Sequence, residues 1–146
     1  MPLVSRVIRN CTNDRSFSEL NFWLLPITIA GEQGKCTFDV LLDTGAQRTV
    51  FTQDIQEIVG IQGGRARQIV TPSGFSNCIE VTINQLEIAS IPFNQLNVLI
   101  CKKLPGRYRD YKINGFLGTD VLSSLVLELN YLTGEITLEK TIVNPN

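Results

Sequence analysis

The stretch that decides the fold is FDVLLDTGAQRTVF, residues 38–51. Its first apolar run, Val40 to Leu42, predicts a strand buried on both faces. Asp43 ends this run, and a carboxylate directly after a buried strand is costly to bury unless it has partners or faces a cleft. Gly45 permits a tight turn and the close approach of another backbone. An ordinary turn at a strand end is the alternative, but the apolar runs on both sides favour a functional loop.

Length and composition describe one globular domain. The chain has 146 residues, of which 43 % are hydrophobic and 18 % charged, enough for a single core and too few for two. The net charge is −1, and no basic run is long enough to predict a nucleic-acid partner. We interpret the basic residues between 102 and 109 as a solvated loop. No segment approaches the ~18 apolar residues of a membrane span, so no membrane partner is expected.

The chain has no histidine, which excludes Ser-His-Asp and Cys-His catalysis within it and disfavours a zinc enzyme. We expect no metal and no cofactor. Acid–base chemistry must then come mainly from carboxylates, Tyr, Lys or Cys. Cys11, Cys36, Cys78 and Cys101 show no C-x-x-C spacing, and we predict reduced thiols in a reducing compartment. The N-terminus lacks the apolar core of a signal peptide. The expected location is the cytoplasm, or a viral or retroelement particle.

The order of patterns along the chain predicts an all-β domain. We interpret residues 1–21 as an N-terminal arm and residues 22–146 as the domain. Two short helices are expected, one from Thr52 to Gly60 and one capped by Thr119 or Asp120 and running to Leu125. A polar insertion is expected at 102–112. Strands are predicted at 22–29, 36–42, 49–51, 68–70, 75–83, 86–91, 96–101, 114–117, 126–131 and 135–139.

Two blocks carry a resemblance to a known family. The block from Asp43 to Ala46 resembles the active-site loop of retroviral-type (retropepsin-like) aspartic proteases, in which Asp-Thr/Ser-Gly-Ala follows a buried strand. Residues 47–53 are most similar to the gammaretroviral branch. A second block, GFLGTDVL at 115–122, resembles the family's Leu-Gly-x-Asp-x-Leu strand and helix start. The two blocks come in the order found in the family.

The resemblance implies a retropepsin-like acid-protease half-barrel that works as a homodimer on an extended peptide or protein substrate. Peptide hydrolysis without a metal or a nucleophile needs one carboxylate as base and one carboxylic acid. The chain offers one Asp-Thr-Gly, so the second Asp43 must come from a second copy. The implied catalytic residues are Asp43, Thr44 and Gly45, and the implied substrate-binding residues are Ala46, Gln47, Pro72, Ser73, Gly74 and Phe75.

Pro72, Ser73 and Gly74 lie at the expected hairpin tip 71–74 and Phe75 follows it, where the family has the flap that covers bound substrate. An ordinary exposed turn is the alternative for this hairpin, and Gly63-Gly64 is a competing position for the flap. Many members carry Asp where Gln47 stands and Arg where Thr119 stands. Both are absent here, and we consider Arg48 with Asp120 as a substitute ion pair.

Two further questions stay open from the sequence. A non-catalytic dimerisation or peptide-binding module with the same fold is the alternative function, because a fold does not guarantee an activity. The apolar side chains of the C-terminal hairpin are expected to join two copies, because uncovered edges of this kind pair with a second chain; the alternative is that they only fill the core of a single chain. These side chains are Leu125, Leu127, Leu129, Ile136 and Leu138.

Overall fold

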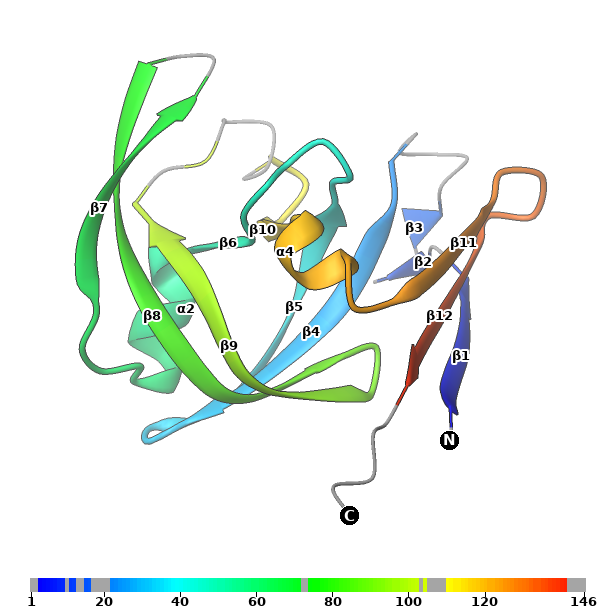
Figure 1. Ribbon diagram of the computed structural model, residues 1–146, viewed down its shortest axis with the longest axis horizontal. Coiled ribbons are helices and arrows are strands. Elements are labelled where there is room, and N and C mark those ends of the chain that lie inside the picture. Colours follow the sequence, from blue (N-terminus) through cyan, green and yellow to red (C-terminus); the bar gives the residue numbers. More distant parts are fainter. Residues whose placement is uncertain are drawn as a thin grey trace.

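The computed structural model describes residues 3–9, 11–12, 15–16, 22–71, 74–102, 104 and 110–141, with the backbone alone up to residue 16. The fold is all-β with two short helices in this part of the chain (Figure 1). The helices are α2 (Gln53–Val59) and α4 (Thr119–Leu122). The strands are β1 (Leu3–Arg9), β2 (Cys11–Thr12), β3 (Arg15–Ser16), β4 (Leu24–Gly31), β5 (Gly34–Leu42), β6 (Val50–Thr52), β7 (Arg65–Thr71), β8 (Gly74–Ile88), β9 (Ile91–Cys101), β10 (Ile113–Leu117), β11 (Val126–Asn130) and β12 (Glu135–Thr141).

Most strands form one sheet that closes on itself. Its order is β4-β5-β10-β6-β9-β8-β7, and an additional pairing of β4 with β8 closes the barrel. A separate three-stranded sheet has the order β1-β12-β11 and lies beside the barrel, while β2 pairs with β3 (Figure 1). Strand β10 is parallel to β5 and antiparallel to β6. The two sequence blocks therefore meet at the centre of the large sheet.

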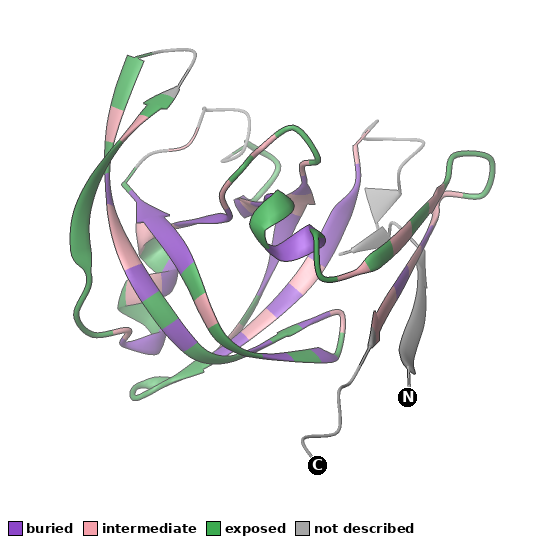
Figure 2. Ribbon diagram, in the orientation of Figure 1, coloured by how far each residue is buried: buried purple, intermediate pink, exposed green. Residues whose placement is uncertain are grey.

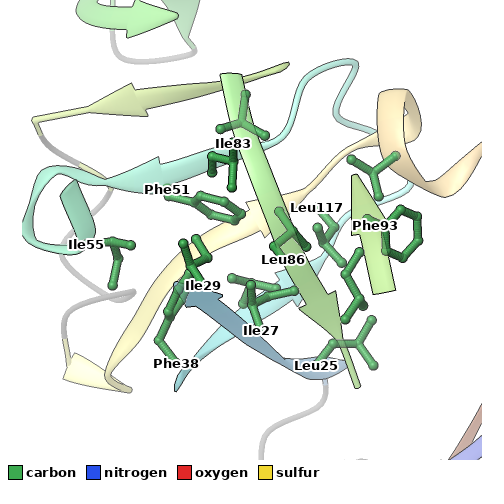
Figure 3. Packing of buried hydrophobic residues seen from close by; sticks show 14 of the residues in the cluster. Leu25, Ile27, Ile29, Phe38, Phe51, Ile55, Ile83, Leu86, Phe93 and Leu117 are labelled. Atoms are coloured by element: carbon green, nitrogen blue, oxygen red, sulfur yellow. The ribbon is translucent and has the colours of Figure 1, made fainter. Parts of the chain in front are cut away.

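The core fills the barrel with aliphatic and aromatic side chains. Strand β8 alternates between buried and exposed positions, with Val81, Ile83, Leu86 and Ile88 turned inward (Figure 2). Side chains from β4, β5, β6, β8, β9 and β10 converge in this core (Figure 3). Burial of this kind is worth about 1.5–3 kcal/mol per large aliphatic side chain. This packed core fixes the positions of the strands that lead into the two sequence blocks.

The first helix follows its sequence signals in part. Thr52 is the N-cap and Gly60 the left-handed C-cap (φ 72°), as predicted. The Thr52 side chain makes no capping bond; its Oγ1 accepts a hydrogen bond from Asn114 Nδ2 at 3.2 Å. Ile55 and Val59 are buried, whereas Ile58 is 54 % exposed and lies outside the buried face of the helix.

The second helix differs from the prediction at both ends. Its N-cap is Gly118 rather than Thr119 or Asp120, and it ends at Leu122, three residues early. Gly118 lies close to the backbone of Arg48, so the start of the helix is set by tertiary packing and not by a capping side chain.

The expected strand at residues 86–91 is also corrected. Ala89 and Ser90 form a two-residue turn with φ of 50° and 71°, which divides the segment between β8 and β9. Such a turn needs positive φ at both residues and normally announces itself as Asn-Gly or Asp-Gly. Ala-Ser carries no such signal, so the sequence reads as a continuous strand.

The predicted reduced state is wrong for two of the four cysteines. Cys78 and Cys101 form a disulfide, and Cys36 is free. Cys78 on β8 lies directly opposite Cys101 on β9, with 4.3 Å between their Cα atoms. A disulfide requires the two Cα atoms to lie close together, as they do here. The partners are 23 residues apart, and only the strand register brings them together. The prediction of a reducing compartment, which rested on four free thiols, is therefore no longer supported by these two cysteines.

The C-terminal hairpin packs on its own chain. Ile136 and Leu138 are fully buried, and the leucines at 125, 127 and 129 pack against the same core. Strand β12 pairs with β1 on one side and β11 on the other. The interpretation that these side chains fill the core of a single chain is therefore the one the structure supports. Val126 and Leu132 remain exposed on the hairpin.

Two sequence expectations concern the least described parts of the chain. Leu3–Arg9, within the expected arm, forms β1, and the boundary at residue 22 stays a prediction. In the expected polar insertion, residues 103 and 105–109 lie outside the described residues. No helix in the described ranges is long and apolar enough to cross a membrane.

Candidate active site

Asp43 lies where β5 leaves the sheet. Its backbone N–H donates to Leu117 O at 3.0 Å, and the N–H of Leu42 donates to Trp23 O at 2.9 Å. Because β5 and β10 are parallel, both strands end at the same edge of the sheet, and this edge is where the polar loop begins. Asp43 is half-buried, whereas Thr44 and Gly45 are exposed. The backbone of Asp43 is thus held in place by a hydrogen bond, while its side chain is partly accessible to solvent beside the exposed residues Thr44 and Gly45.

The loop after Asp43 is a tight turn closed by hydrogen bonds. Ala46 N–H donates to Asp43 O at 3.2 Å, and Gly45 N–H donates to the carboxylate oxygen Asp43 Oδ1 at 3.0 Å. A backbone N–H bound to a carboxylate oxygen is a charge-assisted contact, and it orients the side chain. Gln47 continues the loop with an exposed side chain. Residues 43–47 of the predicted site therefore form one continuous loop.

The second sequence block supports this loop from behind. Thr119 N–H donates to Ala46 O at 2.8 Å, and Gly118 N–H donates to Thr49 Oγ1 at 3.0 Å. A Cβ on Gly118 would lie 2.7 Å from the carbonyl carbon and oxygen of Arg48 and 2.9 Å from Ala46 O. Real Cβ atoms do not approach backbone this closely, so only glycine fits between the two segments.

Thr49 is a site residue that the sequence interpretation missed. Its side chain is fully buried, and its hydroxyl donates to Asp120 Oδ1 at 2.8 Å while it accepts from Gly118. Its backbone N–H donates to Asp120 Oδ2 at 2.9 Å. A threonine before the apolar Val-Phe reads as an ordinary strand residue. A sequence argument could have identified Thr49 only by asking which hydroxyl in the first block binds the carboxylate of Asp120 in the second.

Replacing Thr49 by valine should loosen the loop. Valine matches threonine in shape but leaves the Gly118 N–H and Asp120 Oδ1 without this partner, and an unsatisfied buried polar group costs about 1–3 kcal/mol. We expect the free energy of unfolding, measured by urea denaturation, to fall by that amount. Thr49→Ser keeps the hydroxyl and should recover most of the loss. Equal stability of Thr49→Val and the natural chain would show that this hydrogen-bond network does not support the loop.

Arg48 and Asp120 form the substitute ion pair considered from the sequence. Arg48 Nε lies 3.5 Å from Asp120 Oδ2. Two further partners of Arg48 were not anticipated: its guanidinium donates to Glu80 Oε2 at 3.2 Å and to Asn97 Oδ1 at 2.7 Å. Both lie on strands distant in sequence, and no local pattern marks them.

Glu80 contacts the side chains of three arginines. Besides Arg48, it lies 3.5 Å from Arg65 Nη2 and 3.4 Å from Arg67 Nε. The hydrogen bond from Arg48, with the charges of Arg67 and Arg65, holds the pKa of the Glu80 carboxyl below its ordinary value of 4.5 against the opposing effect of burial. The carboxylate therefore stays charged into moderately acidic solution.

The other predicted site residues lie on the β7–β8 hairpin. The hairpin is confirmed, with Thr71 opposite Gly74, while Pro72 and Ser73 lie outside the described residues. Phe75 is 72 % exposed. In Figure 1 the hairpin projects past the end of β9, and the last residues of β7 and the first of β8 lie on the same upper side as the loop after β5. Gly63 and Gly64 precede β7, so the competing flap position is not a hairpin tip.

The described residues include no group of three or more His, Cys, Asp or Glu side chains that could hold a metal ion.

Comparisons with known proteins agree with this geometry. The sequence profile described as "Aspartyl protease" matches residues 25–121, which include the first block and all of the second except Leu122. A retropepsin-like aspartic protease from Rickettsia conorii has a similar solved structure, with a TM-score of 0.63 and 12 % sequence identity over 95 % of this chain and 93 % of that chain. No curated protein sequence matches significantly. The chain has a retropepsin-like fold and belongs to the aspartyl protease family.

Proposed function

We propose that this protein is an aspartic endopeptidase whose active site forms between two copies of the chain, each supplying Asp43. The observation that carries the proposal is the position of Asp43. Its backbone is held by Leu117 O and its carboxylate by Gly45 N–H, while Thr44 beside it is exposed. A second copy can approach this exposed loop without disturbing the core.

Two carboxylates brought together in this way supply an acid and a base. Like charges held close cannot both ionise easily, so the pair shares one proton. The ionised carboxylate takes a proton from a water molecule, whose oxygen attacks the carbonyl carbon of the peptide bond, and the protonated one gives its proton to the carbonyl oxygen. Collapse of this tetrahedral intermediate breaks the C–N bond as the first carboxyl gives its proton to the leaving amine and the second carboxylate takes one back from a hydroxyl of the intermediate, so that the pair again holds one proton.

The neighbouring residues take supporting roles in the proposal. Thr44 holds the two loops together by hydrogen bonds near the two-fold axis, and Gly45 offers its backbone to the substrate. Ala46 and Gln47 then flank an extended peptide that pairs as a strand beside the loop. Gln47 also supports a nearer likeness to the gammaretroviral branch.

The β7–β8 hairpin fits the role of a flap over the substrate. Strand β9 pairs with β8 no further than Cys78, so beyond that residue β8 pairs with β7 alone. Val70 and Phe75 near the tip are 77 % and 72 % exposed, and we propose that they cover bound peptide together with Pro72, Ser73 and Gly74. Opening of the hairpin would admit the substrate.

Incubation with an unfolded protein substrate across a range of pH tests the proposal. Only the singly protonated pair has both acid and base, so cleavage should be greatest at about pH 4–6 and decline on the alkaline side. Pepstatin, an inhibitor of aspartic proteases, should block it. Activity that keeps rising past about pH 9, far above any ordinary carboxyl titration, would contradict the mechanism. Peptide binding without cleavage would favour the non-catalytic module.

A further inference from the structure

Glu80 joins two parts of the molecule that the sequence keeps apart. It lies on β8, opposite Arg65 on β7, and contacts the guanidinium groups of Arg65 and Arg67. The same carboxylate contacts Arg48, five residues after Asp43. A single side chain therefore bridges the hairpin and the segment that follows the Asp43 loop.

Arg48 is itself held in place by side chains other than Glu80. It bonds Asn97 at 2.7 Å and pairs with Asp120 at 3.5 Å, and Asp120 holds the Thr49 hydroxyl and backbone. A displacement of Glu80 is thus passed to the residues that support the Asp43 loop through contacts present in the structure. The contacts run from Arg65 and Arg67 through Glu80 to Arg48.

The position of Glu80 along the hairpin matters as much as its partners. The Cys78–Cys101 disulfide joins β8 to β9 two residues nearer the tip. Beyond Cys78, β8 has only β7 as a neighbour, from Gln68 opposite Asn77 to the tip. Glu80 and the disulfide hence both lie in the stem of the hairpin, where β8 still pairs with β9, while the segment nearer the tip does not pair with β9.

We infer that Glu80 is a positioning residue that holds the β7–β8 hairpin at a fixed angle over the Asp43 loop through Arg48. It does not touch the reacting atoms. Its effect on catalysis rests on the proposed function, whereas its effect on hairpin motion does not. Loss of the carboxylate removes the contact between the hairpin and Arg48 and leaves Arg48, Arg65 and Arg67 to repel one another, while the Cys78–Cys101 disulfide and the pairing of β8 with β9 remain.

The expected size of the effect follows from exposure. The Glu80 side chain is 14 % exposed, but Arg48 is 38 %, Arg67 47 % and Arg65 70 % exposed. Exposed ion pairs are weak and are screened by salt, while a network around one shared carboxylate is stronger than a single pair. We therefore expect changes of about three- to tenfold in rates and affinities, which shrink at high salt.

The contact should also depend on acidity. The charged groups that face Glu80 are Arg48, Arg65 and Arg67, with Asp120 on the far side of Arg48. The arginines lower the pKa of Glu80 in the folded chain. The stabilisation by its ionised carboxylate is therefore fully present when the pH lies above the ordinary pKa of a glutamate, and it is lost as the pH falls through the lowered pKa of the folded chain. At about pH 5 the contact is intact, and in stronger acid it fails.

Amide hydrogen exchange of Glu80→Gln in an Asp43→Asn background measures the coupling without any catalysis. Amides of 68–71 and 74–77 should exchange about three- to tenfold faster, with those of β4 and β5 unchanged. Glu87→Gln, an exposed glutamate further along the same strand, is the matched control and should change nothing. No acceleration in the hairpin, or equal acceleration in β4 and β5, would overturn the assignment.

Kinetics on the chain with Asp43 intact provide the second measurement. If the hairpin covers the substrate, Glu80→Gln should raise KM about three- to tenfold with kcat within about twofold, because binding and not chemistry is weakened. Glu80→Asp, which keeps the charge, should recover part of the loss. A fall in kcat at unchanged KM would contradict a positioning role through the hairpin. Absence of cleavage by the natural chain would refute the proposed function, while hydrogen exchange would still decide the coupling.

Discussion

Asp43→Asn should reduce kcat/KM for peptide cleavage by about 10³- to 10⁴-fold, toward the upper end of what a positioned acid–base group contributes. Asparagine can neither accept the proton of the attacking water nor hold the shared proton. Its side-chain oxygen can still accept the hydrogen bond that Gly45 N–H gives to Asp43 Oδ1. The loop should therefore keep its shape while the chemistry is lost.

The matched control is Asp54→Asn, which removes a carboxylate from the first turn of α2, where it is exposed. It should cleave at the rate of the natural chain. Thermal unfolding of both variants should differ little from that of the natural chain, since neither change alters the core. Clear residual proteolysis by purified Asp43→Asn would remove Asp43 from the catalytic role.

Deleting β12 by truncation after Tyr131 should abolish cooperative folding. The deletion removes Ile136 and Leu138, both fully buried, and burial of each is worth about 1.5–3 kcal/mol. It also takes from β1 and β11 the strand that lies between them. The loss is comparable with the total stability of a small domain, about 5–15 kcal/mol. Circular dichroism should show no cooperative thermal transition.

Point substitutions separate this effect from loss of a dimer contact. Leu138→Ala should cost about 2–5 kcal/mol of unfolding free energy, as expected of a buried leucine. Leu132→Ala, at a position 98 % exposed, should stay within about 0.5 kcal/mol. A truncated chain that unfolds cooperatively as a monomer would restore the expectation from the sequence that the hairpin serves mainly to join two copies.

The shape of the loop that carries Asp43 could be predicted because its determinants are local. Asp43 and Gly45 stand two positions apart directly after an apolar strand, and the turn they form depends on residues within that stretch. Arg48 and Asp120 could be paired in advance because each belongs to a block with its own pattern. The barrel followed from the succession of short alternating segments, because strand alternation reports burial directly.

The parts that the sequence did not predict depend on register between distant strands. Cys78 meets Cys101 because β8 and β9 align at that pair, and Glu80 meets Arg48 across 32 positions of sequence. Neither pairing leaves a mark in local composition. The burial of Ile136 within its own chain was hard to predict for a related reason. The alternation along its strand predicts one buried face, but not whether the same chain or a second copy covers that face.

Mixing natural and Asp43→Asn chains tests the central claim, that one active site needs an Asp43 from each of two copies. The chains are unfolded together, refolded at constant total concentration, and assayed as the natural fraction is varied. Random pairing predicts that activity falls as the square of that fraction, to roughly one quarter in an equal mixture, because a mixed dimer has one carboxylate. A linear decline, to roughly one half, would show that each chain works alone and would contradict the shared site.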